Sequence, residues 1–419
     1  MLNDCVPRTF LARINSAKTR LQQICCYLLA ILVSFIMHTT AAHADWQQTL
    51  TAAKGQSVYF NAWGGGDNIN QYIQWVAKQV DQQYGITLKH VKLADTADAV
   101  SRLIAEKSAG RDDDGSIDLM WINGENFRAL KDQKLIYGPF SQNLPNYRYV
   151  DESARQSLTL DFGTAVEGME SPWGMSQVVF IYDTQTLSAP PTSMLELLEY
   201  AQQNPGRITY PEPPQYLGTT FLKQALYELI ADPSVLSEPV ENIDFELLSK
   251  PLWDYLDQLH PVTWRSGDVF PASAEAMIRL LDDQEIDISL SFDVSSASVQ
   301  IEQGNLADTV RSYVFDKGTI SNTHFVAIPY NSASKAASQV VANFLLSPQA
   351  QVKKQTPTVW GDLTVLSHDR LSAQQQQQFA QLPRGIATLS LEQLGQSIPE
   401  PDTSWVAALE SAWRARYAK

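Results

Sequence analysis

The sequence predicts an α/β protein with two lobes, each a mostly parallel sheet flanked by helices. Strand-like segments alternate with amphipathic helical segments from about residue 57 to residue 140, and the alternation resumes after residue 178. Repeated β–α–β units imply parallel strands that are covered by helices. The chain beyond residue 44 is also longer than one hydrophobic core usually serves, which favours two lobes over one.

The first half of the chain contains three predicted strands and the helices that connect them. Ser57–Trp63 is rich in aromatic and β-branched residues, and three glycines end it. The helix that follows has Asp67 as its expected cap, an apolar face at helical spacing, and Gly85 as its stop. Further strands are expected near Ile86–Leu93 and at Ile117–Ile122.

The second half repeats this organisation. Val178–Tyr182 is expected to be a strand, a capping box at Ser193 opens a helix, and Gly218–Thr220 starts another helix. The segment Ile286–Phe292 alternates apolar with polar residues, which is the clearest strand signal in the chain. A last strand is expected at Phe325–Pro329, followed by a helix.

Residues 1–44 have the pattern of an export signal. A basic segment precedes the apolar run Ile24–Met37, and small residues then surround a cleavage site after Ala44. The run is shorter than the ~20 residues needed to span a bilayer, which favours a cleaved leader over an uncleaved anchor. Cys5, Cys25 and Cys26 are the only cysteines, so the mature protein is expected in the periplasm without disulfides.

The charge balance narrows the class of partner. The chain has 31 Lys and Arg against 46 Asp and Glu, a formal charge of −15. Such a charge repels nucleic acid, so no nucleic-acid partner is expected, and it can draw cationic solutes towards a cleft. The alternative interpretation is that the charge serves solubility alone.

Motifs for catalysis, cofactors and metals are missing from the sequence. There is no P-loop, and a dinucleotide fingerprint counted from Gly64 would need a glycine where Ile69 stands. The acidic segment Asp112–Gly115 does not fit an EF-hand register, and the histidines are scattered. We therefore predict no catalytic residues, no cofactor and no metal. A periplasmic hydrolase or lyase that uses cleft carboxylates stays open as the alternative.

Aromatic residues next to glycine-containing turns are the positive signal. Trp63 precedes three glycines, Trp121 precedes Asn123-Gly124, and Trp173 precedes a glycine as well. Ligands of open parallel sheets lie beyond the carboxyl ends of the strands, where glycines let backbone N–H groups approach a solute. An indole at the same place offers a flat apolar or cation–π surface. Packing within the core is the competing interpretation for each tryptophan.

Six segments between residues 58 and 351 carry a resemblance to a known family. They are VYFNAWGGGDNINQYIQWV from Val58, DLMWINGENFRALK from Asp118, PWGMSQVVFIYDT from Pro172, GRITYPEPPQYLGTTFLKQALYEL from Gly206, FPASAEAMIRLLDDQEIDISLSF from Phe270, and NTHFVAIPYNSASKAASQVVANFLLSPQAQ from Asn322. With these segments the chain resembles the periplasmic solute-binding proteins of bacterial ABC importers. More narrowly it resembles the YnjB-type group, which is related to thiamine-, polyamine- and iron-binding receptors.

The resemblance implies a type II periplasmic-binding-protein fold with a ligand cleft between the lobes. Lobe 1 would comprise residues 45–171 and about 325–365, and lobe 2 residues 172–324 and about 366–419. Hinge closure would trap a small-molecule solute and present it to an ABC permease in the inner membrane. The receptor would be a monomer and not an enzyme. A protein-interaction or chemosensory module on the same fold is a third hypothesis, because a fold alone does not fix a function.

Ligand-binding residues are proposed by their position. They are Trp63, Gly64, Gly65, Trp121, Asn123 and Asn126 in lobe 1, Trp173 and Met175 at the crossover, and Tyr210, Thr219, Thr220, Ser291 and Asp293 in lobe 2. Asp293 has two interpretations, a counter-charge to a cationic solute or a helix cap. His324 is expected to lie in the crossover without touching the ligand. Thiamine-like compounds and polyamines fit best, and an amino acid or a sugar stays open.

Overall fold

The computed structural model describes residues 46–153, 155–390 and 392–418. The predicted leader and its cleavage site after Ala44 lie outside the described residues. The chain divides into two compact units, residues 1–52 and residues 53–419, and the fold below is that of the second unit. None of the helices in the described ranges combines the length and the apolar character that crossing a membrane requires.

The first sheet has six strands. These are β1 (Ser57–Trp63), β2 (Thr87–Leu93), β3 (Leu119–Ile122), β6 (Glu170–Gln177), β10 (Thr319–Ala327) and β11 (Ser397–Pro399). Five of them follow the order β11-β10-β3-β1-β2, and β6 pairs with β10 off this path. The pairs β1–β2 and β1–β3 are parallel, as predicted, whereas β10 runs antiparallel to both β3 and β6. The two strands β4 (Leu160–Asp161) and β5 (Thr164–Ala165) form a separate hairpin.

Helices accompany the first sheet, and the sequence pattern predicted only some of them. They are α2 (Asp67–Tyr84), α3 (Thr96–Ser108), α4 (Glu125–Asp132), α10 (Lys335–Leu345), α11 (Pro348–Gln355) and α12 (Ala373–Ala380). The apolar face predicted for α2 is buried, and Gly85 ends the helix in the left-handed region at φ 68°. The expected cap is one residue off, because Gly66 is the N-cap and Asp67 lies in the first turn. There its carboxylate still faces the positive end of the helix.

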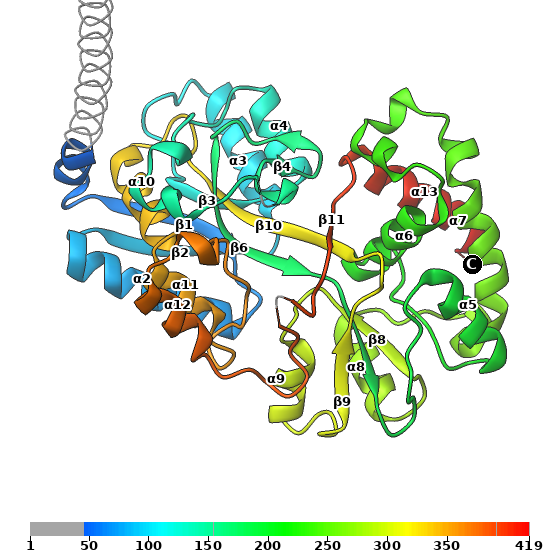
Figure 1. Ribbon diagram of the computed structural model, residues 1–419. Coiled ribbons are helices and arrows are strands. Elements are labelled where there is room, and N and C mark those ends of the chain that lie inside the picture. The colour runs from blue at the N-terminus through cyan, green and yellow to red at the C-terminus, as the bar shows by residue number, and fades with distance from the viewer. Residues whose placement is uncertain (1–45, 154, 391, 419) are drawn as a thin grey trace, which may run out of the picture. The chain divides into compact units, whose positions relative to one another are not determined.

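The second lobe is built on three strands, β7 (Val179–Asp183), β8 (Ile288–Ser291) and β9 (Val310–Tyr313), in the order β8-β7-β9. Both pairs are antiparallel, which differs from the mostly parallel sheet expected here. The reason lies in the connections, since β7 continues β6 after the single residue Val178 and the chain returns towards the first sheet through β9 and β10. Figure 1 shows β6 and β10 side by side where the chain passes between the two sheets.

Helices of the second lobe bury a core of their own. They are α5 (Met194–Gln203), α6 (Tyr216–Leu229), α7 (Phe245–Leu259), α8 (Ala274–Asp282), α9 (Ser296–Glu302) and α13 (Ser404–Tyr417). The C-terminal helix α13 contributes Trp405, Leu409 and Trp413 to this core. Short 3-10 helices span Ser141–Asn143, Pro145–Tyr149, Gln156–Leu158, Pro233–Ser237, Val240–Asn242, His260–Val262, Trp264–Gly267 and His368–Arg370.

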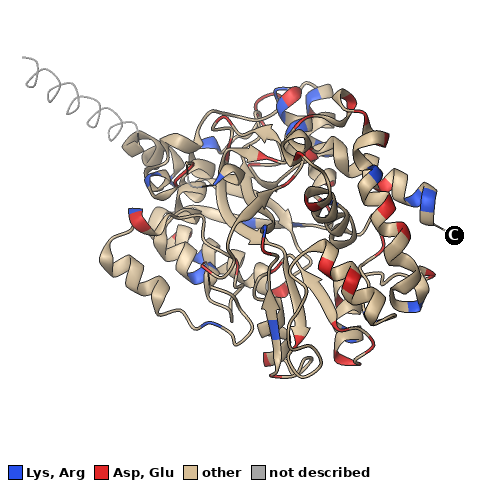
Figure 2. Cartoon of the chain, turned by 45° about the vertical axis from the view of Figure 1, so that its right-hand side comes forward, with Lys and Arg blue, Asp and Glu red and all other residues tan. Residues whose placement is uncertain are grey.

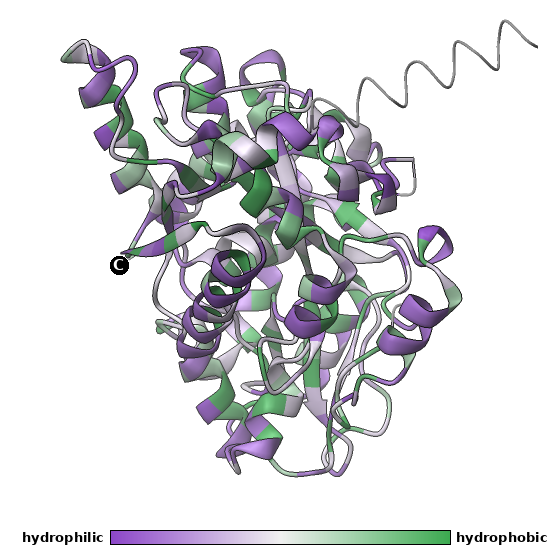
Figure 3. Cartoon of the chain, turned by 90° about the vertical axis from the view of Figure 1, so that its left-hand side faces the viewer, coloured by the Kyte–Doolittle hydropathy of each residue, from purple (hydrophilic) through white to green (hydrophobic). Residues whose placement is uncertain are grey.

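Polar and apolar residues separate as expected for helices packed on sheets. Figure 3 shows helices with hydrophilic residues on one side and hydrophobic residues on the other, and Figure 2 shows most charged residues on the outer helices and loops. Before the chain enters the second lobe for the last time, Leu366 pairs with Val150, so this stretch packs on the first lobe. The lobe boundaries predicted from the sequence stay predictions.

Candidate functional site

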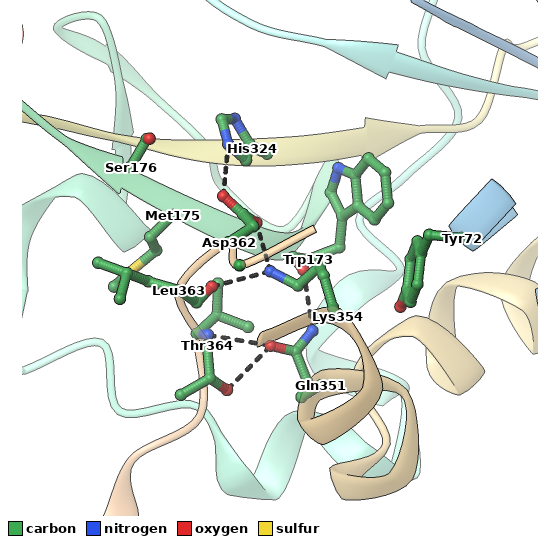
Figure 4. Close-up of polar contacts among 12 residues, drawn as sticks. Tyr72, Trp173, Met175, Ser176, His324, Gln351, Lys354, Asp362, Leu363 and Thr364 are labelled. Atoms are coloured by element: carbon green, nitrogen blue, oxygen red, sulfur yellow. Dashed lines mark hydrogen bonds and ion pairs between the residues drawn. The ribbon is translucent and has the colours of Figure 1, made fainter. Parts of the chain in front are cut away.

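A buried polar network lies where β6 and β10 run together (Figure 4). The Lys354 ammonium forms an ion pair with the Asp362 carboxylate and donates to the Leu363 carbonyl at 2.8 Å. His324 Nε2 lies 3.1 Å from the other Asp362 oxygen. Burial alone would raise the pKa of Asp362, but the charges of Lys354 and His324 outweigh it and hold that pKa below its ordinary value. Asp362 is therefore an anion at neutral pH.

Gly174 makes room for this network. A Cβ atom at Gly174 would lie 2.1 Å from Asp362 Oδ2 and 2.6 Å from Lys354 Nζ. The second anchor is Gln351, whose amide donates to the Trp173 carbonyl at 2.8 Å and accepts from Thr364 Oγ1 at 2.9 Å. The network therefore ties α11 and the segment that follows it to the crossover strand β6.

Aromatic rings surround the network. Trp173 is fully buried at the centre, and its ring centroid lies 5.0 Å from that of Trp121 and 5.3 Å from that of Trp360. The His324 ring packs edge-on to Trp121 at 5.3 Å and stacks on Trp360 at 6.1 Å with an interplanar angle of 13°. The Trp173 indole N–H has no hydrogen-bond partner in the described part of the chain. Trp173 is thus a core residue that supports the half-exposed Trp121.

The end of β8 brings a lobe-2 carboxylate to this network. Burial and the negative charge of Asp362 raise the pKa of Asp293 from 3.8 to about 6, while the Ser295 N–H and His324 act in the opposite direction. Asp293 Oδ1 accepts a hydrogen bond from Ser295 N at 2.9 Å, and Asp293 N donates to Ser291 Oγ at 3.0 Å. Asp293 therefore caps a turn and also lies within electrostatic reach of lobe 1.

A second aromatic surface comes from lobe 2. Tyr216, at the start of α6, is 43% exposed, and its ring packs against Phe292 with centroids 5.3 Å apart. The Tyr216 hydroxyl accepts from Asn322 Nδ2 of β10 at 2.8 Å. Ser176 of β6 donates to the Phe292 carbonyl. Thus β10 contacts the start of α6 through Tyr216, and β6 contacts the segment that holds Phe292 and Asp293.

The glycine-rich turns of lobe 1 form the remaining edge of the candidate site. Trp63 is 42% exposed at the end of β1, and a Cβ atom at Gly65 would lie 2.4 Å from its ring. The Gly64 carbonyl accepts from Asn70 Nδ2 at 2.9 Å, which fixes the start of α2. Asn123 and Asn126 are half-buried beside Gly124. These turns hold the exposed Trp63 ring and two half-buried amides near strand ends, and their role in ligand binding stays a prediction.

Four predicted residues lie elsewhere. Tyr210 is fully buried, and its hydroxyl bonds to His260 Nε2 at 2.7 Å. Thr219 donates to Glu410 Oε1 at 2.7 Å, and Thr220 donates to the Tyr216 carbonyl at 2.7 Å. These two hydroxyls are inside the helix rather than at its start, because Gln215 caps α6 four residues before Thr219.

Met175 is the fourth of them. It is consecutive with Ser176 on β6, so the two side chains point to opposite faces of the sheet. Ser176 contacts Phe292 on the side of Asp293, whereas the Met175 sulfur accepts a hydrogen bond from Arg155. Met175 therefore belongs to the other face of the crossover.

Sequence reasoning missed several residues of the site. Tyr216, Phe292, Trp360, Asp362 and Lys354 were not among the candidates, and His324 was expected without a role. One signal was available, because Trp360-Gly361 repeats the tryptophan–glycine pair of Trp63-Gly64 and Trp173-Gly174. The contacts of Lys354 with Asp362 and of Asp362 with His324 arise only in the folded chain. No group of three or more His, Cys, Asp or Glu side chains suited to a metal occurs within the ranges that the structure describes.

Comparisons with known proteins agree with the geometry. The model of the bacterial extracellular solute-binding protein family matches residues 75–381. The protein YnjB of Escherichia coli K12 is 43% identical over 394 residues, which is 94% of this chain and 98% of that protein. An ABC transporter structure from Clostridium perfringens matches with a TM-score of 0.60 at 12% identity, covering 86% of this chain and 98% of that one. The spermidine/putrescine substrate-binding protein PotD of Streptococcus pneumoniae matches with a TM-score of 0.56 at 13% identity, covering 86% and 99%.

Proposed function

Because this chain belongs to the bacterial extracellular solute-binding protein family, we propose that it carries a small cationic solute, held between its two lobes, to an ABC importer. The solute would be an amine that stacks on aromatic rings, of the polyamine or thiamine type. Residues 1–44 would be removed on export to the periplasm, and the monomeric receptor would release the solute unchanged to its permease.

The observation that carries this proposal is the place of the Asp293 carboxylate. On one side it lies near His324, whose ring packs on Trp121, and on the other side it follows Phe292, which packs on Tyr216. A carboxylate that burial makes costly to ionise gains most from a cation beside it. Aromatic faces add attraction for the same cation without a covalent step.

The crossover supports reversible closure of the lobes. Only Val178 separates β6 from β7, and β10 returns antiparallel beside β6, so bending can concentrate at these two connections. Closure would bring the exposed rings of Trp63 and Tyr216 towards a shared ligand. Asp362 supports binding rather than catalysis, because Lys354 and His324 already occupy its oxygens.

Intrinsic tryptophan fluorescence during titration with spermidine, thiamine and neutral sugars tests the proposal. We expect saturable binding of a cation, recovery of the unchanged solute, and a loss of affinity of at least about tenfold in Asp293→Asn, as a charged partner is removed. The matched control is Asp308→Asn, which removes an exposed lobe-2 carboxylate and should bind as the wild type does. Equal affinity in Asp293→Asn, preference for neutral sugars, or conversion of the solute into a product would each contradict the proposal.

A further inference from the structure

A cavity of about 540 Å³ lies beside the crossover strand β6 and is lined by Arg155, which contacts Met175 of that strand. Its apolar lining comes mainly from Leu158, Leu363, Leu366, Leu371 and Phe379. Val294 and Ser295 of lobe 2 close another side. A volume of this size, lined by both apolar and polar side chains, is large enough to hold a small molecule.

Arg155 lines this cavity as a cation without an anionic partner among the residues that the structure describes. Its guanidinium donates from Nη1 to the Met175 sulfur at 2.9 Å and forms no ion pair with any residue that the structure describes. A thioether sulfur is a weak acceptor, whereas a guanidinium has five N–H donors. The side chain is half-buried, and burial lowers the pKa of Arg155 below its ordinary value. A charge in such surroundings normally has an anionic partner.

The carboxylates near the cavity do not supply that partner. Asp151 lines the cavity, but it forms an ion pair with Arg370 at 3.0 Å. Glu392 lines it as well and is exposed to solvent. One further cationic side chain, Arg384, is exposed at its border. The cationic character of the cavity is therefore centred on Arg155.

We propose that this cavity is a second ligand site, which takes a small organic carboxylate. The carboxylate would accept two hydrogen bonds from the Arg155 guanidinium, the geometry for which this fork of donors is suited. The apolar body of the ligand would pack against Leu363 and Phe379. This site adjoins the turn that holds Asp293, and it would accept an anion, whereas Asp293 would accept a cation.

The site also spans both lobes. Arg155 and Leu363 come from lobe 1, whereas Val294 and Ser295 directly follow Asp293 in lobe 2. Ser295 Oγ donates to the Gly361 carbonyl at 3.2 Å across this border. A ligand in the cavity would therefore contact the turn that positions Asp293.

Calorimetric titration of the full chain with acetate, phenylacetate and octanoate, each paired with its neutral amide, tests the proposal. At low salt we expect phenylacetate or octanoate to bind at least about tenfold more tightly than its amide. Arg155→Met should abolish this preference, and Arg155→Gln should do the same if the methionine variant folds poorly. The control Arg102→Gln removes an exposed arginine of α3 and should leave binding unchanged.

Thermal unfolding separates a ligand site from a structural arginine. Without an anion, Arg155→Met should keep or raise the midpoint, because it removes a charge that lacks a partner. The carboxylate should raise the midpoint of the wild type but not that of the variant. The proposal is wrong if no acid binds more tightly than its amide, or if the acid binds Arg155→Met as tightly as it binds the wild type.

Discussion

Replacing Asp293 by asparagine should stabilise the ligand-free protein at neutral pH. Burial and the Asp362 charge raise the pKa of Asp293 from 3.8 to about 6, so folding disfavours its ionised form. The difference between a pKa of 3.8 and one of about 6 corresponds to about 3 kcal/mol between the two protonation states. Asparagine is uncharged and has nearly the same shape, and its Oδ1 can still accept from Ser295 N as Asp293 does at 2.9 Å. The variant therefore removes the penalty and keeps the turn.

The pH dependence of this gain has a defined sign. Above about pH 6 Asp293 is ionised in both the folded and the unfolded protein, so the wild type carries the full penalty. As the pH falls from about 6 to about 4, the folded protein binds the proton first, and the stability of the wild type rises. Below pH 3.8 the penalty is absent, and the difference between wild type and Asp293→Asn should approach zero.

Urea unfolding at pH 7.5 and at pH 4 measures the difference. We expect a gain of about 1–3 kcal/mol at pH 7.5 at unchanged m-value, because partial solvent access reduces the full figure. The exposed control Asp308→Asn should stay within about 0.5 kcal/mol of the wild type. A loss of stability in Asp293→Asn at pH 7.5, or a difference that does not change with pH, would refute the reasoning.

Three further substitutions test the interior. Lys354→Met should lower the free energy of unfolding in urea by about 3–5 kcal/mol, because it leaves Asp362 buried and without its lysine partner. Adding Asp362→Asn to this variant should restore part of the lost stability. Purely additive losses in the double variant would contradict the prediction. Glu170→Gln should change the free energy of unfolding by less than about 1 kcal/mol. Burial and the charge of Asp161 raise the pKa of Glu170 well above its ordinary value and keep its carboxyl protonated. A loss of several kcal/mol in urea unfolding would instead show that the carboxyl is ionised. Gly174→Ala should lower the free energy of unfolding by about 1–3 kcal/mol, because the added Cβ atom would clash with Asp362. An unchanged midpoint of thermal unfolding would contradict the close packing at this position.

Most of the fold could be predicted because its signals are local. The apolar face of α2 and its Gly85 stop follow from helical spacing and from the left-handed conformation that glycine tolerates. The period-two segment was a strand, but its polar face is not solvated. Ser289 is fully buried, and Asp287 pairs with Arg207, because the second lobe covers both faces of β8. Alternation of residue types predicts a strand and says less about what covers its polar side.

The candidate site was predictable only in part, because local sequence patterns do not encode contacts between distant segments. The sequence singled out Trp63 and Trp121 beside glycines, and their rings are exposed or half-exposed near strand ends, while their role in ligand binding stays a prediction. Thr219 and Thr220 were expected at the start of a helix, but α6 begins earlier, after its N-cap Gln215. This cap could not be predicted, because glutamine is not among the residues preferred at that position. Asp362 and His324 meet across 38 residues of chain, a contact that no local pattern encodes.

One buried lysine links the two halves of the molecule. The Lys223 ammonium forms an ion pair with Glu400 at 2.5 Å, and it lies 5.5 Å from the Phe162 ring centroid of lobe 1 and 5.4 Å from that of Tyr216 in lobe 2. Separation of the lobes would take one ring away from this cation and let water replace it. The two lobes therefore attract each other without a ligand, so ligand binding needs to supply only part of the free energy that favours the closed state.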